Sequence, residues 1–142
     1  MKISKYTFII LLFNFLFSLQ INENFAIEVA ENFYYSKNDP RTTEFAYDSI
    51  NMYNHNNNDI FYVVSIKPRG FILISSDNLV RPILGYSFDE NFRFSNELPE
   101  NLNYLFNLYE EEFSTSIIEN SYDINISQEW EKYSNFVDFE QS

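Results

Sequence analysis

IFYVVSIKPRGFILIS, the sequence of residues 60–75, predicts two β-strands joined by a tight turn. Residues 60–66 are β-branched or aromatic apart from Ser65, and residues 71–75 have the same apolar character. Between them, Pro68 suits the second position of a turn and Gly70 suits the fourth. Both faces of both strands are apolar, so each face of the hairpin needs a cover. Helices can cover one face, and the rest of the chain or a partner is left to cover the other.

Two amphipathic helices are predicted, one before the hairpin and one after it. The first spans residues 22–35, with Asn22 as a fair N-cap, and the second spans residues 99–118. The run of glutamates from Glu110 to Glu112 lies mainly off the apolar stripe of the second helix. The apolar stripe of the first helix is Ala26, Val29, Ala30 and Phe33, and that of the second is Leu102, Leu105, Phe106, Tyr109, Phe113 and Ile117.

Two further strands complete the predicted sheet. Residues 42–50 are rich in Thr, Phe and Tyr, and residues 81–87 form a short edge strand because Pro82 cannot donate to a ladder. The sequence therefore predicts an α+β fold. It consists of a small antiparallel sheet of three to four strands with a central hairpin, packed with an N-terminal helix and a second helix after the sheet.

The connecting segments are expected to be loops. Residues 51–59 are polar, contain His55 and three consecutive asparagines, and are predicted to be mobile. Residues 88–98 are a second loop, in which Phe92 and Phe94 are the expected anchors.

The ends of the chain are interpreted separately from the predicted domain. Residues 1–18 have two lysines before a short apolar run, which is typical of a secretory signal peptide cleaved between residues 18 and 26. An uncleaved membrane anchor is the alternative. Residues 19–119 form the domain, and residues 120–142 are a tail with a possible short helix around Trp130. The expected location is secreted or periplasmic, without a membrane span after cleavage.

The chain contains few of the residue patterns on which catalytic sites are built. The chain has no cysteine, and its 21 acidic against 9 basic residues give a net charge of −12, which disfavours nucleic-acid binding. His55 is the only histidine, and a helix spreads Glu110 to Glu112 around a solvated face. There is no phosphate-binding loop or dinucleotide fingerprint. We therefore expect no enzyme, no cofactor and no metal site.

One series of motifs runs through nearly the whole mature chain to about Phe113. It consists of the first-helix stripe, FYVV at 61–64, RGFILIS at 69–75, Asp77, RPILGYS at 81–87, and PEN at 99–101 followed by Leu105, Tyr109 and the acidic run. The order of these motifs resembles that of the propeptides of streptopain-type cysteine peptidases and of the stand-alone inhibitors called Spi. The family usually has glycine where this chain has Ser76.

The resemblance implies an inhibitor that blocks the active-site cleft of a streptopain-like cysteine peptidase. It also implies that Asn101, with Pro99 and Glu100 beside it, reaches the catalytic centre. The alternative for Asn101 is a helix cap, and the two roles are compatible. The alternatives for the whole chain are a propeptide that acts in cis on its own peptidase, and an extracellular recognition module that has kept the fold without inhibition.

Overall fold

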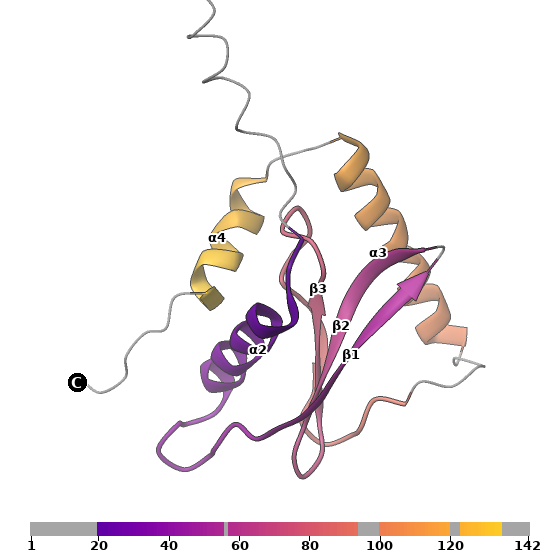
Figure 1. The fold of residues 1–142 in the computed structure, drawn as a ribbon. Helices are drawn as coiled ribbons and strands as arrows, with labels where there is room; N and C mark the ends of the chain where they lie inside the picture. Colours follow the sequence, from indigo (N-terminus) through magenta and orange to yellow (C-terminus); the bar gives the residue numbers. More distant parts are fainter. Residues whose placement is uncertain (1–19, 56, 94–99, 120–122, 135–142) are drawn as a thin grey trace, which may run out of the picture.

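An antiparallel sheet lies between helices on both of its faces (Figure 1). The computed structural model describes residues 20–55, 57–93, 100–119 and 123–134, without the side chains of residues 100–103, 105 and 116–119. The α+β class is confirmed. In chain order the elements are α2 (Glu23–Lys37), β1 (Tyr47–His55), β2 (Asn58–Ile66), β3 (Phe71–Ser75), β4 (Ile83–Ser87), α3 (Glu100–Glu119) and α4 (Ile124–Ser134).

The predicted hairpin forms the centre of the sheet. The strand order is β1-β2-β3-β4, and β2 pairs with β3 from Phe61 opposite Ser75 to Ser65 opposite Phe71. The edge position predicted from Pro82 is also confirmed, because β4 is the last strand and Pro82 immediately precedes it. The carbonyl of Pro82 still accepts a hydrogen bond of 3.0 Å from the amide of Ser75. Proline lacks a backbone N–H donor and keeps its carbonyl acceptor. It therefore fits at the edge of a sheet, where no strand on the outer side needs that donor.

The predicted loop at residues 51–59 is wrong, because most of it is strand. β1 continues to His55, which pairs with Asn58, so the chain reverses within two residues. Asn57 takes a positive φ of 66°, a conformation that asparagine tolerates better than most residues. The polar composition that suggested a loop belongs to an edge strand, which has a neighbour on one side only.

The first strand also begins later than predicted, at Tyr47 instead of Thr42. The amides of Thr42 and Thr43 donate to the carbonyl of Asp39 at 3.1 and 3.0 Å, so these residues form a turn after α2. Arg41 closes the same turn through an ion pair of 2.9 Å with the carboxylate of Asp39. The amides and hydroxyls of both threonines donate hydrogen bonds to the carbonyl of Asp39 and so stabilise a turn. The strand propensity of threonine, on which the prediction relied, does not indicate this role.

α2 has the N-cap and the buried stripe that the sequence predicted. The amide of Phe25 donates to Oδ1 of Asn22 at 3.0 Å, which satisfies one of the free donors of the first turn. The residues that α2 buries are Ala26, Val29, Ala30 and Phe33.

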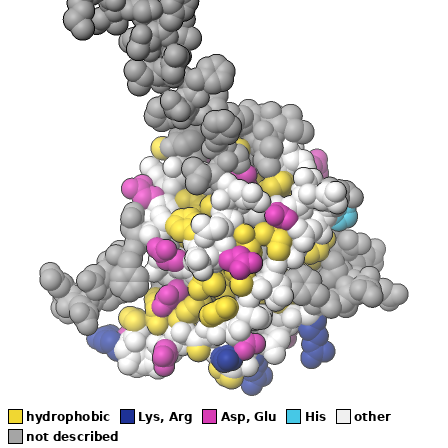
Figure 2. All heavy atoms as spheres, viewed as in Figure 1, with side chains coloured by type: hydrophobic (Ala, Val, Ile, Leu, Met, Phe, Trp, Pro, Cys, Tyr) yellow, Lys and Arg dark blue, Asp and Glu magenta, His cyan; other side chains and the backbone are white. Residues whose placement is uncertain are grey.

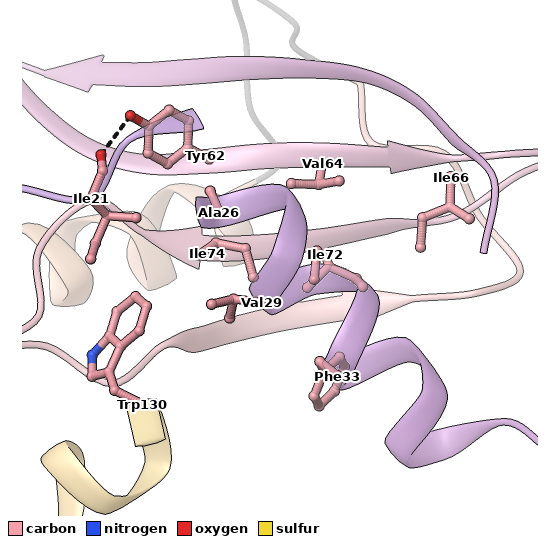
Figure 3. Close-up of a cluster of buried hydrophobic side chains, with 11 residues drawn as sticks. Ile21, Ala26, Val29, Phe33, Tyr62, Val64, Ile66, Ile72, Ile74 and Trp130 are labelled. Carbon is pink, nitrogen blue, oxygen red and sulfur yellow. Dashed lines mark hydrogen bonds between the residues drawn. The ribbon is translucent and has the colours of Figure 1, made fainter. Parts of the chain in front are cut away.

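Two separate apolar clusters cover the two faces of the sheet. On one face α2 and α4 pack over alternate strand residues, as Figure 3 shows. On the other face α3 packs over the residues in between. The strand residues of the first cluster are Tyr62, Val64, Ile66, Ile72 and Ile74, and the alternating ones of the second are Phe61, Val63 and Leu73, joined near the start of β2 by Ile60. The period of two residues in a strand thus supplies both faces, as the apolar pattern required.

α4 is the possible short helix around Trp130, and it belongs to the first cluster. Trp130 is buried, and its ring stacks on Phe25 of α2 with centroids 6.0 Å apart. Its indole Nε1 donates a hydrogen bond of 2.8 Å to the carbonyl of Val80. Residues beyond position 119 therefore contribute to the apolar core.

Candidate functional site

α3 carries the residues predicted to contact a peptidase, and an aromatic cluster fastens this helix to the sheet. Phe106 is buried between three rings, with its centroid 5.0 Å from Phe61, 5.1 Å from Tyr53 and 6.1 Å from Phe92. Phe113 is buried in the same cluster two turns further on. Of the two expected loop anchors, Phe92 is confirmed, and Phe94 lies outside the described residues.

Tyr109 gives α3 a polar attachment as well as an apolar one. Its ring packs against the second cluster, and its hydroxyl donates to the carbonyl of Leu84. Burial raises the pKa of Tyr109, and the charge of Glu112 acts in the same direction. The hydroxyl is therefore held in its protonated, donating form. Docking through Tyr109 and Phe113 agrees with the predicted stripe, while the side chain of Leu105 lies outside the description.

His55 and Glu110 form a second polar attachment that the sequence did not suggest. Nδ1 of His55 lies 3.0 Å from Oε1 of Glu110, and the Glu110 side chain is only 19% exposed. The same carboxylate acts on Tyr53, whose pKa is raised by burial first and by the charge of Glu110 second. The Glu110 oxygen is buried, and no donor among the described residues meets it with hydrogen-bond geometry, so its contact with His55 is an ion-pair contact that requires a protonated imidazole. His55 therefore ties the end of β1 to α3, and Glu110 is not part of a solvated face.

The predicted contact residues stand at the start of α3. Glu100 and Asn101 are its first two residues, and their side chains lie outside the description. Pro99 lies outside the described residues altogether. The attachments at Phe106, Tyr109 and Glu110 begin less than two turns later, so the backbone of the first turn leads directly into a packed helix.

The outward face of α3 holds two apolar residues that the sequence reading passed over. Tyr104 and Leu108 are 66% and 41% exposed, one turn apart on the helix. The sequence alone could have identified them, because Tyr104 and Leu108, three and seven positions after Asn101, do not lie on the core stripe. They were missed because the predicted core stripe leaves them out and no role was assigned to apolar residues outside it.

A polar hollow of about 350 Å³ lies near the turn between β1 and β2. Its carboxylates serve local structure: Asp59 accepts from Nε2 of Gln20 at 3.2 Å, and Asp77 accepts from the amide of Leu79 at 2.9 Å. Ser76, where the related family has glycine, is buried and donates to the carbonyl of Ile60 at 3.0 Å. Within the described ranges no group of three or more metal-ligating side chains occurs. The residues lining the hollow are Gln20, Asn57, Asn58, Asp59, Ser76, Asp77 and Phe113.

Comparison with known proteins identifies a family. The sequence model of the family described as Spi protease inhibitor matches residues 18–113, which is more than half of the chain. The chain therefore belongs to the Spi protease inhibitor family, as the order of its motifs indicated. No curated protein and no solved structure matches the chain.

Membership of this family defines the class of protein. It is a protease inhibitor and not an enzyme, and its partner is a protease. In the part of the chain that the structure describes, no helix has the length and apolar character needed to cross a bilayer.

Proposed function

We propose that the chain is an exported inhibitor of a streptopain-like cysteine peptidase, which it inactivates by occupying the active-site cleft. One observation carries the proposal. The family match runs from residue 18, at the end of the predicted leader, to Phe113 in α3, and includes Pro99, Glu100 and Asn101. The matched segment thus contains the sheet, most of its α3 cover and the predicted contact residues together.

The start of α3 suits a mechanism without bond breaking. An asparagine side chain carries two donors and an acceptor, so it can hydrogen-bond to both walls of a cleft without introducing a charge. The helix behind it is held by Phe106, Tyr109 and Glu110, so little order has to be gained on binding. A preformed surface of this kind inhibits by steric occupation, and the peptidase finds no substrate bond positioned for cleavage.

Export is proposed on one ground alone, which is the predicted leader in residues 1–18. The two lysines and the short apolar run in residues 1–18 predict removal of the leader between residues 18 and 26. Mass spectrometry of the protein outside the cytoplasm should show the shortened chain. Recovery of the intact N-terminus in the membrane fraction would contradict export as a free inhibitor.

The test combines inhibition with stability for Asn101→Ala. If Asn101 contacts the peptidase, the inhibition constant should rise by the equivalent of about 1–3 kcal/mol, because partner groups in the cleft lose their hydrogen bonds. If it serves only as a cap, the unfolding midpoint should fall and the inhibition constant of the folded protein should stay unchanged. Gln128→Ala is the matched control, an exposed amide on α4 across the sheet, and should alter neither value. Absence of inhibition by the unaltered protein would refute the proposed target.

A further inference from the structure

We propose that the outward stripe of α3, formed by Tyr104 and Leu108 with Glu111 beside them, is a second contact surface for the peptidase. This inference rests on the proposed function and extends it beyond the first turn of the helix. The surface would dock on a positively charged region of the peptidase that contains an apolar socket.

The helix geometry separates this stripe from the core. Phe106, Tyr109 and Phe113 point to the sheet, and residues 104 and 108 are about half a turn away from their mean direction. Both residues are exposed, Tyr104 at 66% and Leu108 at 41%. They are spaced four residues apart, so they are neighbours on the helix surface.

The pairing on α3 distinguishes these two residues from isolated apolar residues at the surface. Single exposed apolar residues are ordinary, whereas adjacent ones lying outside the core indicate a contact surface. The other large apolar side chains exposed within the described residues are on three different elements, and Tyr86 among them packs against the rings of Phe33 and Phe88. Tyrosine is also a residue type that often dominates binding energy at interfaces.

The charge of α3 indicates the chemistry of the partner. Its sequence, ENLNYLFNLYEEEFSTSIIE, contains five glutamates and no lysine, arginine or histidine. Glu111 is exposed, and it lies beside the apolar pair because it follows Leu108 by three residues on the helix. On the face shown in Figure 2 the Lys and Arg side chains gather along the lower edge of the molecule, away from its upper part.

The same charge argues against a second copy of this chain as the occupant. Two α3 helices face to face along this stripe would bring the exposed Glu111 of one helix close to that of the other, without a basic side chain from either helix, which is unfavourable at neutral pH. The negative charge of α3 favours a basic partner surface in two ways. Opposite charge accelerates the encounter of the two proteins, and it orients them as they meet.

The position of the stripe extends the predicted contact. Asn101 precedes Tyr104 by three residues in the same helix, so one partner surface lying along α3 meets the first turn and then the stripe. The occupant is therefore the same peptidase molecule.

The experiment compares two double variants of the full chain against a purified streptopain-like cysteine peptidase. Tyr104→Ala with Leu108→Ala should raise the inhibition constant at least tenfold and leave the thermal midpoint within about two degrees, because neither side chain is buried. The control is Tyr47→Ala with Ile124→Ala, which removes apolar side chains that are 45% and 54% exposed elsewhere. It should change the inhibition constant less than twofold.

A charge variant tests the partner's chemistry separately. Glu111→Lys should slow association several-fold at low salt, and the difference should shrink as salt is added. Inhibition by the unaltered protein together with an unchanged constant for the α3 double variant would overturn the inference and leave the proposed function standing. A dimer of the unaltered protein that dissociates in the double variant would also overturn it, by showing that a second copy occupies the stripe. No inhibition by the unaltered protein would refute the proposed function itself.

Discussion

Removing the side chain of Trp130 should show that α4 is part of one cooperative fold. The structure places this ring in the first apolar cluster, against Phe25, with its indole nitrogen bonded to the carbonyl of Val80. Trp130→Ala therefore removes a large buried ring and leaves an acceptor in the core without its donor. Trp130→Phe keeps most of the ring area and removes only the hydrogen bond.

The two variants should differ in size of effect. Truncation of a buried tryptophan to alanine costs about 3–5 kcal/mol. Loss of the hydrogen bond with an acceptor left buried costs about 1–3 kcal/mol. Domains of this kind have a total stability of about 5–15 kcal/mol, so Trp130→Ala removes a large fraction of it.

Denaturant unfolding followed by far-ultraviolet circular dichroism measures both effects. Fluorescence serves only for the unaltered chain, because Trp130 is its single tryptophan. Ile124→Ala on the same helix is the control, since this side chain is 54% exposed and its loss should change stability by about 0.5 kcal/mol or less. If Trp130→Ala unfolds with the free energy of the unaltered chain, then α4 does not contribute to the fold and the domain ends before residue 120, where the sequence placed its boundary.

Three further outcomes are expected. Leu73→Ala should lower the free energy of unfolding by about 2–5 kcal/mol, because Leu73 is buried between β2, β4 and α3, and an unchanged thermal melt would contradict its place in the core. Tyr109→Asp should destabilise strongly by burying an unpaired charge, whereas Glu111→Gln on the exposed face should be nearly silent, and equal denaturant midpoints would show a wrong helical register. The pKa values of Tyr53, Tyr62 and Tyr109 are raised in the folded protein, chiefly by burial, so the stability they contribute should be complete below about pH 10 and be lost as pH rises through the folded values. Thermal melts from pH 8 to 11 measure this, and Tyr109→Phe should reduce the alkaline loss; a flat profile for the unaltered chain would contradict the burial of these hydroxyls.

The sequence was most informative where a periodic pattern was set by burial. The stripe of α2 and the two-sided hairpin were predictable from the spacing of their apolar residues. In each case only one secondary structure, a helix for α2 and paired strands for the hairpin, lets all of these residues be buried. The hairpin also required a cover on each face, and α3 and α4 supply covers from segments that the sequence read as helical.

The sequence was least informative at the edge of the sheet and in the polar contacts across it. β1 is polar because one of its sides has no strand beside it, so its composition resembled that of a loop. The contact between His55 and Glu110 joins residues far apart in the chain, and no local pattern marks either as a partner of the other. The role of Asn101 came from a family resemblance alone, and its side chain lies outside the description, so that role stays a prediction.

The separation of the two apolar clusters has a consequence for how the protein opens. The two clusters lie on opposite faces of the sheet, so α3 can detach by breaking the contacts of one cluster while α2, α4 and the other face stay packed. Amide protons of α3 and of α2 should then exchange with solvent through different opening events, with different free energies. For an inhibitor without disulfides that meets a peptidase, the lifetime of the molecule is set by the easier of these openings, because cleavage requires an unwound segment. The attachments at Phe106, Tyr109 and Glu110 therefore determine how long α3 resists proteolytic cleavage.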